Sequence, residues 1–287
     1  LLETERWSAP AASEAVNSPI HSLPRTYLDR KNCDPSKLFL SLPNFKSVVA
    51  YWKRFLARRA SSRHMPIVTL LSDLGNRDQY VSEMKGTILS LCPSATIVDI
   101  TNEIAKFDVR MGAFVLAAAS KHFPVGTVHV VVVDPGVGGP RRGLLVESRR
   151  AIYIGPDNGV LLPAASRDGI KEAYSIENQE FMRRPVSPTF HGRDVFAYVA
   201  GKIASGAESS QVGPRISDLV SVAFQKAESC PGSIKCEVLG TDSFGNIVTT
   251  AGRKDLGLSG IEVGIKIKMR AKGRLHSLDV VRTYSDS

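Results

Sequence analysis

The sequence predicts an α/β protein with an N-terminal parallel-sheet α/β domain and a smaller C-terminal β-barrel-like domain. Strand and helix patterns alternate between residues 65 and 133, which favours parallel strands with covering helices. Residues 127–133 form a β-branched apolar run, typical of a strand buried on both faces. After about residue 214 only short strand patterns occur, which indicates a small β domain.

The first half of the predicted α/β domain follows from apolar periodicity. Apolar residues at helical spacing between Tyr80 and Leu91 predict a helix that Pro93 ends. Small apolar residues predict a second helix before the long β-branched run. The predicted elements are a strand at 67–71, a helix that follows Asp78 and ends near Leu91, a strand at 96–100, a helix at 109–119 and the strand at 127–133.

The second half begins with a pair of strands and ends in a helix. Thr189 or Asp194 is the expected cap of that helix, because both residue types accept hydrogen bonds from free backbone N–H groups. The predicted elements are strands at 143–147 and 151–154, a helix at 195–204, and short strands at 233–239, 246–250, 264–269 and 278–281. The predicted domains are therefore an α/β domain at 65–213 and a β domain at 214–287.

Residues 1–64 differ in composition from the rest of the chain. They carry 11 Lys and Arg against 5 Asp and Glu, a net charge of +6, while the remainder carries 26 against 23, a net charge of +3. The basic charge therefore belongs mostly to this leader, which disfavours a nucleic-acid partner for the main body. Within the leader, residues 45–60 can form an amphipathic helix. Its alternatives are membrane-surface or partner contact, organelle targeting, packing on the body, and a poorly ordered extension.

Cysteine usage and hydropathy exclude several classes of protein. The four cysteines form no CxxC pair, and no Cys/His cluster has zinc spacing, so we expect no structural metal. A disulfide between Cys230 and Cys236 is a minor alternative to reduced thiols in the cytoplasm, the expected location. No run approaches the roughly 18 apolar residues of a membrane-spanning helix.

Acidic residues recur in turns at predicted strand ends. These are Asp73, Asp134, Asp157 and Asp242. Asp134 begins a glycine-rich loop that closes with Arg141 and Arg142, and His191 lies in a polar turn. Asp, Arg and His together can orient a water molecule and screen a developing charge. The alternative is solvated turn residues, and we interpret His122 and His129 as structural.

Known nucleotide and nucleophile motifs do not explain this loop. It lacks the third glycine and the following helix of a dinucleotide fingerprint, and it lacks the GK[ST] of a phosphate-binding loop. The chain contains no GxSxG nucleophile elbow.

Six ordered motifs together resemble the S-adenosyl-L-methionine (SAM) hydroxide adenosyltransferases, or SAM hydrolases, which are related to the fluorinase and chlorinase. The motifs are SDLGNRDQYVSEMKG, FDVRMGA, FPVGTVHVVVVDPGVGGPRR, GPDNGVL, TFHGRDVFA and TDSFGN. The resemblance runs from Met65 to about Ser285. It implies a homotrimer that binds SAM between subunits. It also implies attack of water-derived hydroxide on the ribose 5′ carbon, giving adenosine and L-methionine with no cofactor.

The resemblance assigns roles to named residues. The implied catalytic residues are Asp134, Arg141 and His191. The implied substrate-binding residues are Asp73, Asp78 and Phe107 on the ribose side, and Asp242, Phe244 and Asn246 on the methionine side.

The same residues bear on the choice of nucleophile. In halide-using relatives an aromatic residue takes the place of Asp134, and a hydroxyl residue takes the place of Gly192. Asp134 and Gly192 therefore favour water. The alternatives are a halide-dependent SAM adenosyl transferase and a non-catalytic SAM- or adenosine-binding protein. The second alternative follows because relatives continue beyond the TYSD segment, so the β domain is expected to be truncated.

Overall fold

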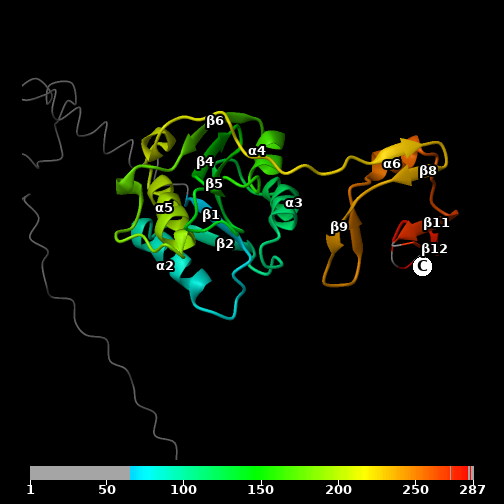
Figure 1. Ribbon diagram of the computed structural model, residues 1–287, viewed down its shortest axis with the longest axis horizontal. Helices are drawn as coiled ribbons and strands as arrows, with labels where there is room; N and C mark the ends of the chain where they lie inside the picture. The colour runs from blue at the N-terminus through cyan, green and yellow to red at the C-terminus, as the bar shows by residue number, and fades with distance from the viewer. Residues whose placement is uncertain (1–64, 272, 284, 286–287) are drawn as a thin grey trace, which may run out of the picture. The chain divides into compact units, whose positions relative to one another are not determined.

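The computed structural model describes residues 65–271, 273–283 and 285, so the predicted helix at 45–60 lies outside the described residues. A six-stranded mixed sheet forms the centre of the α/β part, in the order β2-β1-β3-β5-β4-β6 (Figure 1). Its strands are β1 (Ile67–Ser72), β2 (Thr96–Thr101), β3 (Thr127–Val132), β4 (Gly143–Ser148), β5 (Ala151–Pro156) and β6 (Ile170–Ser175). The predicted strands in this half are confirmed within two residues.

The sheet is parallel except around β4. Strands β2, β1, β3 and β5 pair in parallel, whereas β4 pairs antiparallel with β5 and with β6. The strand pair predicted at 143–154 is therefore a hairpin inside the sheet, and the expected parallel sheet is parallel-dominated. Only two residues separate β4 from β5, too few for the crossover that a parallel neighbour requires.

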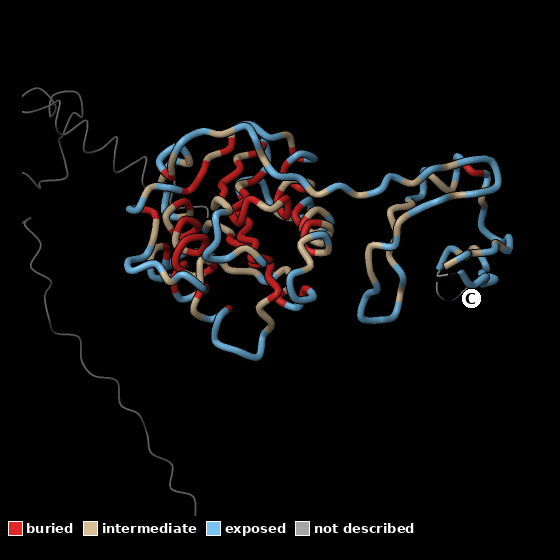
Figure 2. The backbone as a smooth tube through the Cα atoms, viewed as in Figure 1, coloured by how far each residue is buried: buried red, intermediate tan, exposed pale blue. Residues whose placement is uncertain are grey.

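Helices cover both faces of this sheet. The described helices of the α/β part are α2 (Tyr80–Leu91), α3 (Val109–Ser120), α4 (Leu162–Asp168) and α5 (Tyr198–Ala204), with short helical turns η2 (Gln179–Phe181), η3 (Gly192–Ala197) and η4 (Ser209–Val212). Residues of α2, η3 and α5 share one apolar core with alternate residues of β1 and β3. Residues of α3 and α4 share the other core with the intervening strand residues. Figure 2 shows these buried positions in red.

The helix predicted at 195–204 begins earlier and is irregular. Residues 192–197 form a π-helical turn, and its N-cap is His191, whose side chain makes no capping bond. The expected cap at Thr189 or Asp194 is therefore wrong. Asp194 is buried inside the turn, and its carboxylate accepts from the backbone N–H of Ser187 instead.

An extended segment at 214–216, after η4, runs antiparallel alongside the edge strand β6. The Ser175 N–H donates to the Pro214 carbonyl, and the Ile216 N–H donates to the Ala173 carbonyl. This bridge covers backbone groups that an edge strand would otherwise leave open.

The strands after this segment are short and mostly exposed. They form three two-stranded antiparallel sheets in the described residues, rather than a closed barrel. The elements are β7 (Glu228–Cys230), β8 (Ser233–Lys235), β9 (Val238–Thr241), β10 (Ile247–Thr249), α6 (Arg253–Leu258), β11 (Lys266–Ala271) and β12 (Arg274–Asp279). The strand predicted at 233–239 is divided, and the one predicted at 278–281 ends at Asp279. An α/β part followed by a smaller β part is confirmed, while the domain bounds 65–213 and 214–287 stay a prediction.

Candidate active site

Three buried aspartates meet the carboxyl edge of the parallel strands. Asp73 follows β1, Asp134 follows β3 after one residue, and Asp157 follows β5. Neighbouring parallel strands end at the same edge, which is where open α/β sheets bind ligands. Burial of three carboxylates requires partners, because an unpaired charge in the interior is strongly disfavoured.

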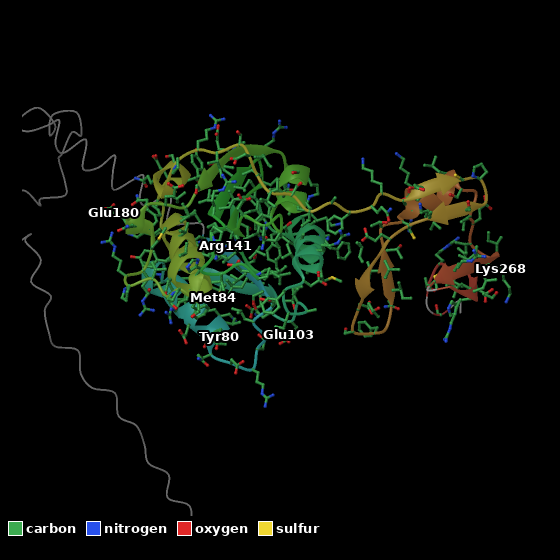
Figure 3. All side chains as sticks on the ribbon, in the orientation of Figure 1. Tyr80, Met84, Glu103, Arg141, Glu180 and Lys268 are labelled. Carbon is green, nitrogen blue, oxygen red and sulfur yellow. The ribbon has the colours of Figure 1, made fainter. Side chains whose placement is uncertain are left out.

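Arg141 is the partner of Asp134. Its Nε donates to Asp134 Oδ1 at 2.9 Å, and its Nη2 donates to Oδ2, which makes a two-point contact. Glycines shape the loop between them. Gly138 has φ +74°, and a Cβ there would lie 2.4 Å from the Pro188 carbonyl oxygen. The loop can therefore pack against the segment that precedes His191 only with glycine at this position. Figure 3 labels Arg141 inside the α/β part.

His191 completes this group. The distance from Arg141 Nη2 to His191 Nδ1 is 2.9 Å. An arginine can only donate, so Nδ1 must accept, and the neutral ring carries its proton on Nε2. Burial lowers the pKa of His191, and the Arg141 charge lowers it further, while the carboxylates of Asp134 and Asp194 oppose both effects. The structure thus brings Asp134, Arg141 and His191 together, with a neutral imidazole beside an ion pair.

Asp73 is joined to Phe107. The Phe107 N–H donates to Asp73 Oδ2 at 2.8 Å, and Phe107 has φ 65°, an unusual conformation for an aromatic residue. Its side chain is 66% exposed. Lys106 Nζ donates to the Asp73 carbonyl. The carboxylate therefore holds a strained backbone turn that presents an aromatic ring to solvent.

Asp78 lies in the exposed loop before α2. The structure gives it no hydrogen bond or ion pair with another described residue, so its contacts do not connect it to Asp73 or Asp134.

Asp242, Phe244 and Asn246 lie in the turn between β9 and β10. Asp242 Oδ1 accepts from the N–H groups of Phe244 and Asn246, each at 2.9 Å. Asn246 Nδ2 donates to Asp242 Oδ2 at 2.8 Å, and these bonds lower the pKa of Asp242. Phe244 is 90% exposed. The turn is a self-contained unit, and its side chains make no described contact with the Asp134 group.

Asp157 has a different partner from Asp134. Arg142 donates to Asp157 Oδ2 from Nε at 3.0 Å and from Nη2 at 2.6 Å, and the Val220 N–H donates to Oδ1 at 3.0 Å. Arg142 also donates to the carboxylate and the carbonyl of Asp218. The bonds to Asp218 and Asp157 raise the pKa of Arg142. These contacts fasten the segment after η4, so the structure gives Asp157 an anchoring role.

Sequence reasoning did not identify Arg193 and Asp194, the residues immediately behind His191. Asp194 is fully buried and bonded to Arg193, yet the pattern suggested a helix cap. The arginine directly before the aspartate in the HGRD turn was the available signal.

Two further features delimit the site. No cluster of His, Cys, Asp and Glu suited to a metal ion occurs in the described part of the chain. A cavity of about 380 Å³ is lined by Glu83, Gly86, Thr87, Ser90, Arg183, Arg193 and Tyr198, and not by Asp134, Arg141 or His191.

This fold and site define a protein with a parallel-dominated α/β part and a buried Asp–Arg–His group at its carboxyl edge. Residues 68–213 match the family model for the SAM hydroxide adenosyltransferase N-terminal domain. The chain therefore belongs to the SAM hydroxide adenosyltransferase family, as the ordered motifs predicted.

Relatives and solved structures agree with this assignment. The chain is 38% identical over 189 residues to the (R)-S-adenosyl-L-methionine hydrolase of Salinispora tropica, which covers 65% of this chain and 72% of the relative. It is 30% identical over 250 residues to the fluorinase of an Actinoplanes species, covering 77% of this chain and 84% of the relative. An uncharacterized conserved protein from Thermotoga maritima has a crystal structure that matches with a TM-score of 0.73 at 34% identity, covering 77% of this chain and 84% of that one.

Proposed function

We propose that this protein is an enzyme that hydrolyses SAM to adenosine and L-methionine. The observation that carries the proposal is the Asp134–Arg141–His191 group, in which a buried carboxylate and a neutral imidazole contact the same guanidinium. The similarity to a relative named (R)-S-adenosyl-L-methionine hydrolase supports SAM as the substrate.

The proposed reaction needs a positioned water and little else. The water oxygen forms a bond to the ribose 5′ carbon, and the C–S bond breaks with its electron pair moving to sulfur. One proton is released. The sulfonium is already a good leaving group, so the proposal includes no metal or redox cofactor. The protein would orient the water in line with the C–S bond and exclude bulk solvent.

The hydrogen bonds divide the roles between the three residues. Each oxygen of Asp134 accepts one bond from Arg141, and a carboxylate has about four acceptor sites, so capacity remains for a water molecule. His191 Nδ1 is occupied by Arg141, which leaves the Nε2–H as a donor. We therefore infer that Asp134 orients the water and receives its proton, and that His191 donates to the water or ribose oxygen.

The proposal places the other residues around the substrate. Asp73 would accept hydrogen bonds from the ribose hydroxyls, the exposed ring of Phe107 would pack against the ribose, and Asp78 would lie nearby. Asp242, Phe244 and Asn246 would hold the methionine end. Since the bonds of that turn are internal and Phe244 is exposed, we propose that the turn acts on the site of another subunit in a homotrimer.

The location of the activity is part of the proposal. Cys230 and Cys236 are exposed free thiols, which are typical of a reducing compartment such as the cytoplasm. No helix within the described residues is long and apolar enough to span a bilayer.

An isotope experiment tests the reaction. The purified protein is incubated with SAM in ¹⁸O-water, and the nucleoside is analysed by mass spectrometry. Adenosine with ¹⁸O at the 5′ position, together with methionine, is the expected result. Chloride-dependent 5′-chloroadenosine would instead identify a halide transferase, and intact SAM recovered from a stoichiometric complex would identify a binding protein.

Subunit mixing tests the shared site. Asp134→Ala and Asp242→Ala are each expected to be nearly inactive as pure proteins. If one site uses Asp134 of one chain and Asp242 of another, mixed oligomers contain some sites with both native residues and regain activity. Lack of recovery, in mixtures that mass spectrometry shows to contain mixed oligomers, would contradict the shared site.

A further inference from the structure

The carboxylate of Asp194 lies three residues after His191 and is fully buried. Its Oδ1 accepts from Arg193 Nε at 2.7 Å. Its Oδ2 accepts from Arg193 Nη2 at 3.0 Å and from the Ser187 N–H at 2.8 Å. A charged group in the interior with this many donors is held in one orientation.

The backbone of Asp194 connects the same segments. Its N–H donates to the Phe190 carbonyl at 3.2 Å, and its carbonyl accepts from the Arg183 N–H at 2.8 Å. His191 therefore lies inside a loop that Asp194 closes at residues 183, 187 and 190. The His191 side chain makes no capping bond that could fix the loop by itself.

Arg193 docks this loop on α2. Its Nη1 donates to Glu83 Oε2 at 2.6 Å, and its guanidinium lies 5.0 Å from the centre of the Phe190 ring. Phe190 in turn makes an edge-on contact with Tyr80, with ring centres 5.3 Å apart. The Glu83 and Arg193 side chains also line the cavity of about 380 Å³.

The turn also packs closely against the strand that carries Asp134. A Cβ on Gly192 would lie 3.1 Å from Val132 Cγ1 and 3.4 Å from Met84 Sδ. The distance between the His191 turn and the end of β3 is therefore fixed on one side by packing and on the other by the Asp194 bonds.

We propose that Asp194, held by Arg193, which Glu83 holds in turn, is a positioning residue for His191: it fixes the orientation of the ring and places a buried negative charge near it. This inference rests on the proposed function for its effect on catalysis. Its effect on the imidazole itself is independent of any reaction.

The charges around His191 give the proposal a measurable sign. The charged groups that act on the ring are Arg141, Asp134 and Asp194. The Asp194 carboxylate raises the pKa of His191 against burial and Arg141. Asp194→Asn keeps the shape and an acceptor oxygen for Ser187 but removes the charge. The His191 ring should then titrate at lower pH than in the native protein.

The first test follows the His191 ring by proton NMR as a function of pH, with the resonance assigned by its loss in His191→Gln. Asp194→Asn is expected to lower the titration midpoint. The matched control is Asp99→Asn. Asp99 lies on β2, where its partly exposed carboxylate pairs with Lys85, and its removal should leave the titration midpoint of His191 unchanged. An unchanged or higher midpoint in a folded Asp194→Asn protein would overturn the proposal, whatever reaction the protein performs.

The second test uses kinetics and does not require the buried charge to be removed. Arg193→Lys keeps the positive charge but cannot make the two-point contact with Asp194. Turnover is expected to fall about 10- to 100-fold, with KM for SAM within about twofold, because a misplaced group affects the chemical step more than binding. Arg183→Lys is the control, because the Arg183 side chain lies 4.0 Å from the Asp194 carboxylate. Turnover of this variant should fall only slightly. Equal losses in the two variants, or a loss confined to KM, would overturn the positioning role.

Discussion

Two neighbouring strands, β3 and β5, lead to buried aspartates that pair with consecutive arginines. Asp134 pairs with Arg141, and Asp157 pairs with Arg142, in each case through Nε and Nη2 of the guanidinium. The two pairs differ in their next contacts. Arg141 continues to His191, whereas Arg142 continues to Asp218.

The comparison shows that the same kind of ion pair can serve two purposes. The second oxygen of Asp157 accepts from the Val220 N–H, so that carboxylate is used entirely for binding its own chain. The carboxylate of Asp134 accepts only the two bonds from Arg141 in the described structure. Its remaining acceptor capacity lies beside a titratable ring. The partner beyond the arginine, and not the pair itself, therefore separates chemistry from anchoring.

The largest expected effect comes from removing the charge of Asp134. Asp134→Asn should lower turnover about 10²- to 10⁴-fold, because the amide cannot receive the proton from water. SAM affinity should change much less. Stopped assays of adenosine release, with calorimetry for binding, measure the two effects.

Asp157→Asn is the matched control for this prediction. It makes the same chemical change on the neighbouring strand and should leave turnover within a few fold. Similar losses in both variants would contradict the division of roles between the two pairs.

The next largest effect is on stability and not on turnover. It comes from His129, a buried titratable side chain that has no ion pair within the described residues, so the free energy of unfolding should depend on pH. His129 lies inside the sheet, stacked on Tyr153, and its Nε2 has no partner in the described structure. Burial lowers the pKa of His129 to about 4 from 6.5. The unfolded chain therefore binds more protons between these values, and stability falls as pH falls from about 6.5 to about 4, by about 3 kcal/mol.

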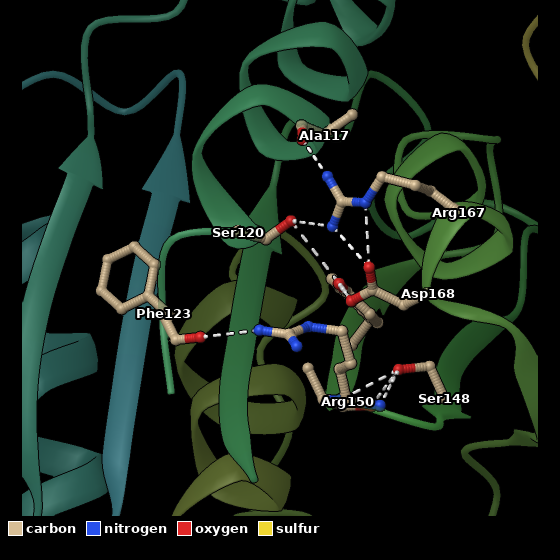
Figure 4. A network of polar contacts seen from close by, with 9 residues as sticks. Ala117, Ser120, Phe123, Ser148, Arg150, Arg167 and Asp168 are labelled. Atoms are coloured by element: carbon tan, nitrogen blue, oxygen red, sulfur yellow. Dashed lines mark hydrogen bonds and ion pairs between the residues drawn. The ribbon is translucent and has the colours of Figure 1, made fainter. Parts of the chain in front are cut away.

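Denaturant unfolding at several pH values measures this loss. His129→Phe keeps the ring contacts with Phe123 and Tyr153 and should show a shallower dependence of unfolding free energy on pH. An identical slope in the variant would assign the acid sensitivity to other groups. Figure 4 shows the polar network around Asp168, which accepts from Arg167. Asp168 also accepts from the Tyr153 hydroxyl at 2.6 Å. Burial, followed by the Asp168 bond, raises the pKa of Tyr153 to about 12.

The smallest expected effect is on the anchoring pair. Asp157→Ala should lower the unfolding free energy by about 1–3 kcal/mol, because Arg142 and the Val220 N–H each lose an acceptor. Chemical denaturation monitored by circular dichroism measures it. Asp218→Ala removes the exposed partner of the same arginine and should leave the midpoint unchanged. A larger loss of unfolding free energy in Asp218→Ala than in Asp157→Ala would show that Asp218, and not Asp157, is the main anchor for Arg142.

Much of the fold could be predicted because local pattern and global structure agree. The β-branched run before Asp134 is typical of a doubly covered strand, and all six residues of β3 are buried. The small residues of α3 pack closely on this segment, with Gly112 next to Val133. The reversal at β4 was less visible, since a strand pair in sequence does not reveal its direction relative to a sheet.

The candidate site was partly predictable for a related reason. Asp134 and Arg141 are close in sequence, so a tight loop predicts their contact. His191 is 50 residues further along the chain than Arg141, and its place in the site was predicted only by the motif resemblance. The role of Asp194 depended on packing between η3 and α2, which no local pattern encodes. Asp157 resembled Asp134 in sequence, and the two are distinguished only by contacts with residues distant in the chain, His191 for the Asp134 pair and Asp218 and Val220 for the Asp157 pair.

The central place of β3 has a consequence for motion. All six of its residues are buried, and it is hydrogen-bonded to β1 on one side and to β5 on the other. Its amide hydrogens should exchange with solvent only through global unfolding. Asp134 follows this strand after a single residue, so opening of the site for substrate entry and product release must come from the loops that face it. Those loops, and not the strand, are where hydrogen exchange should change when a nucleoside binds.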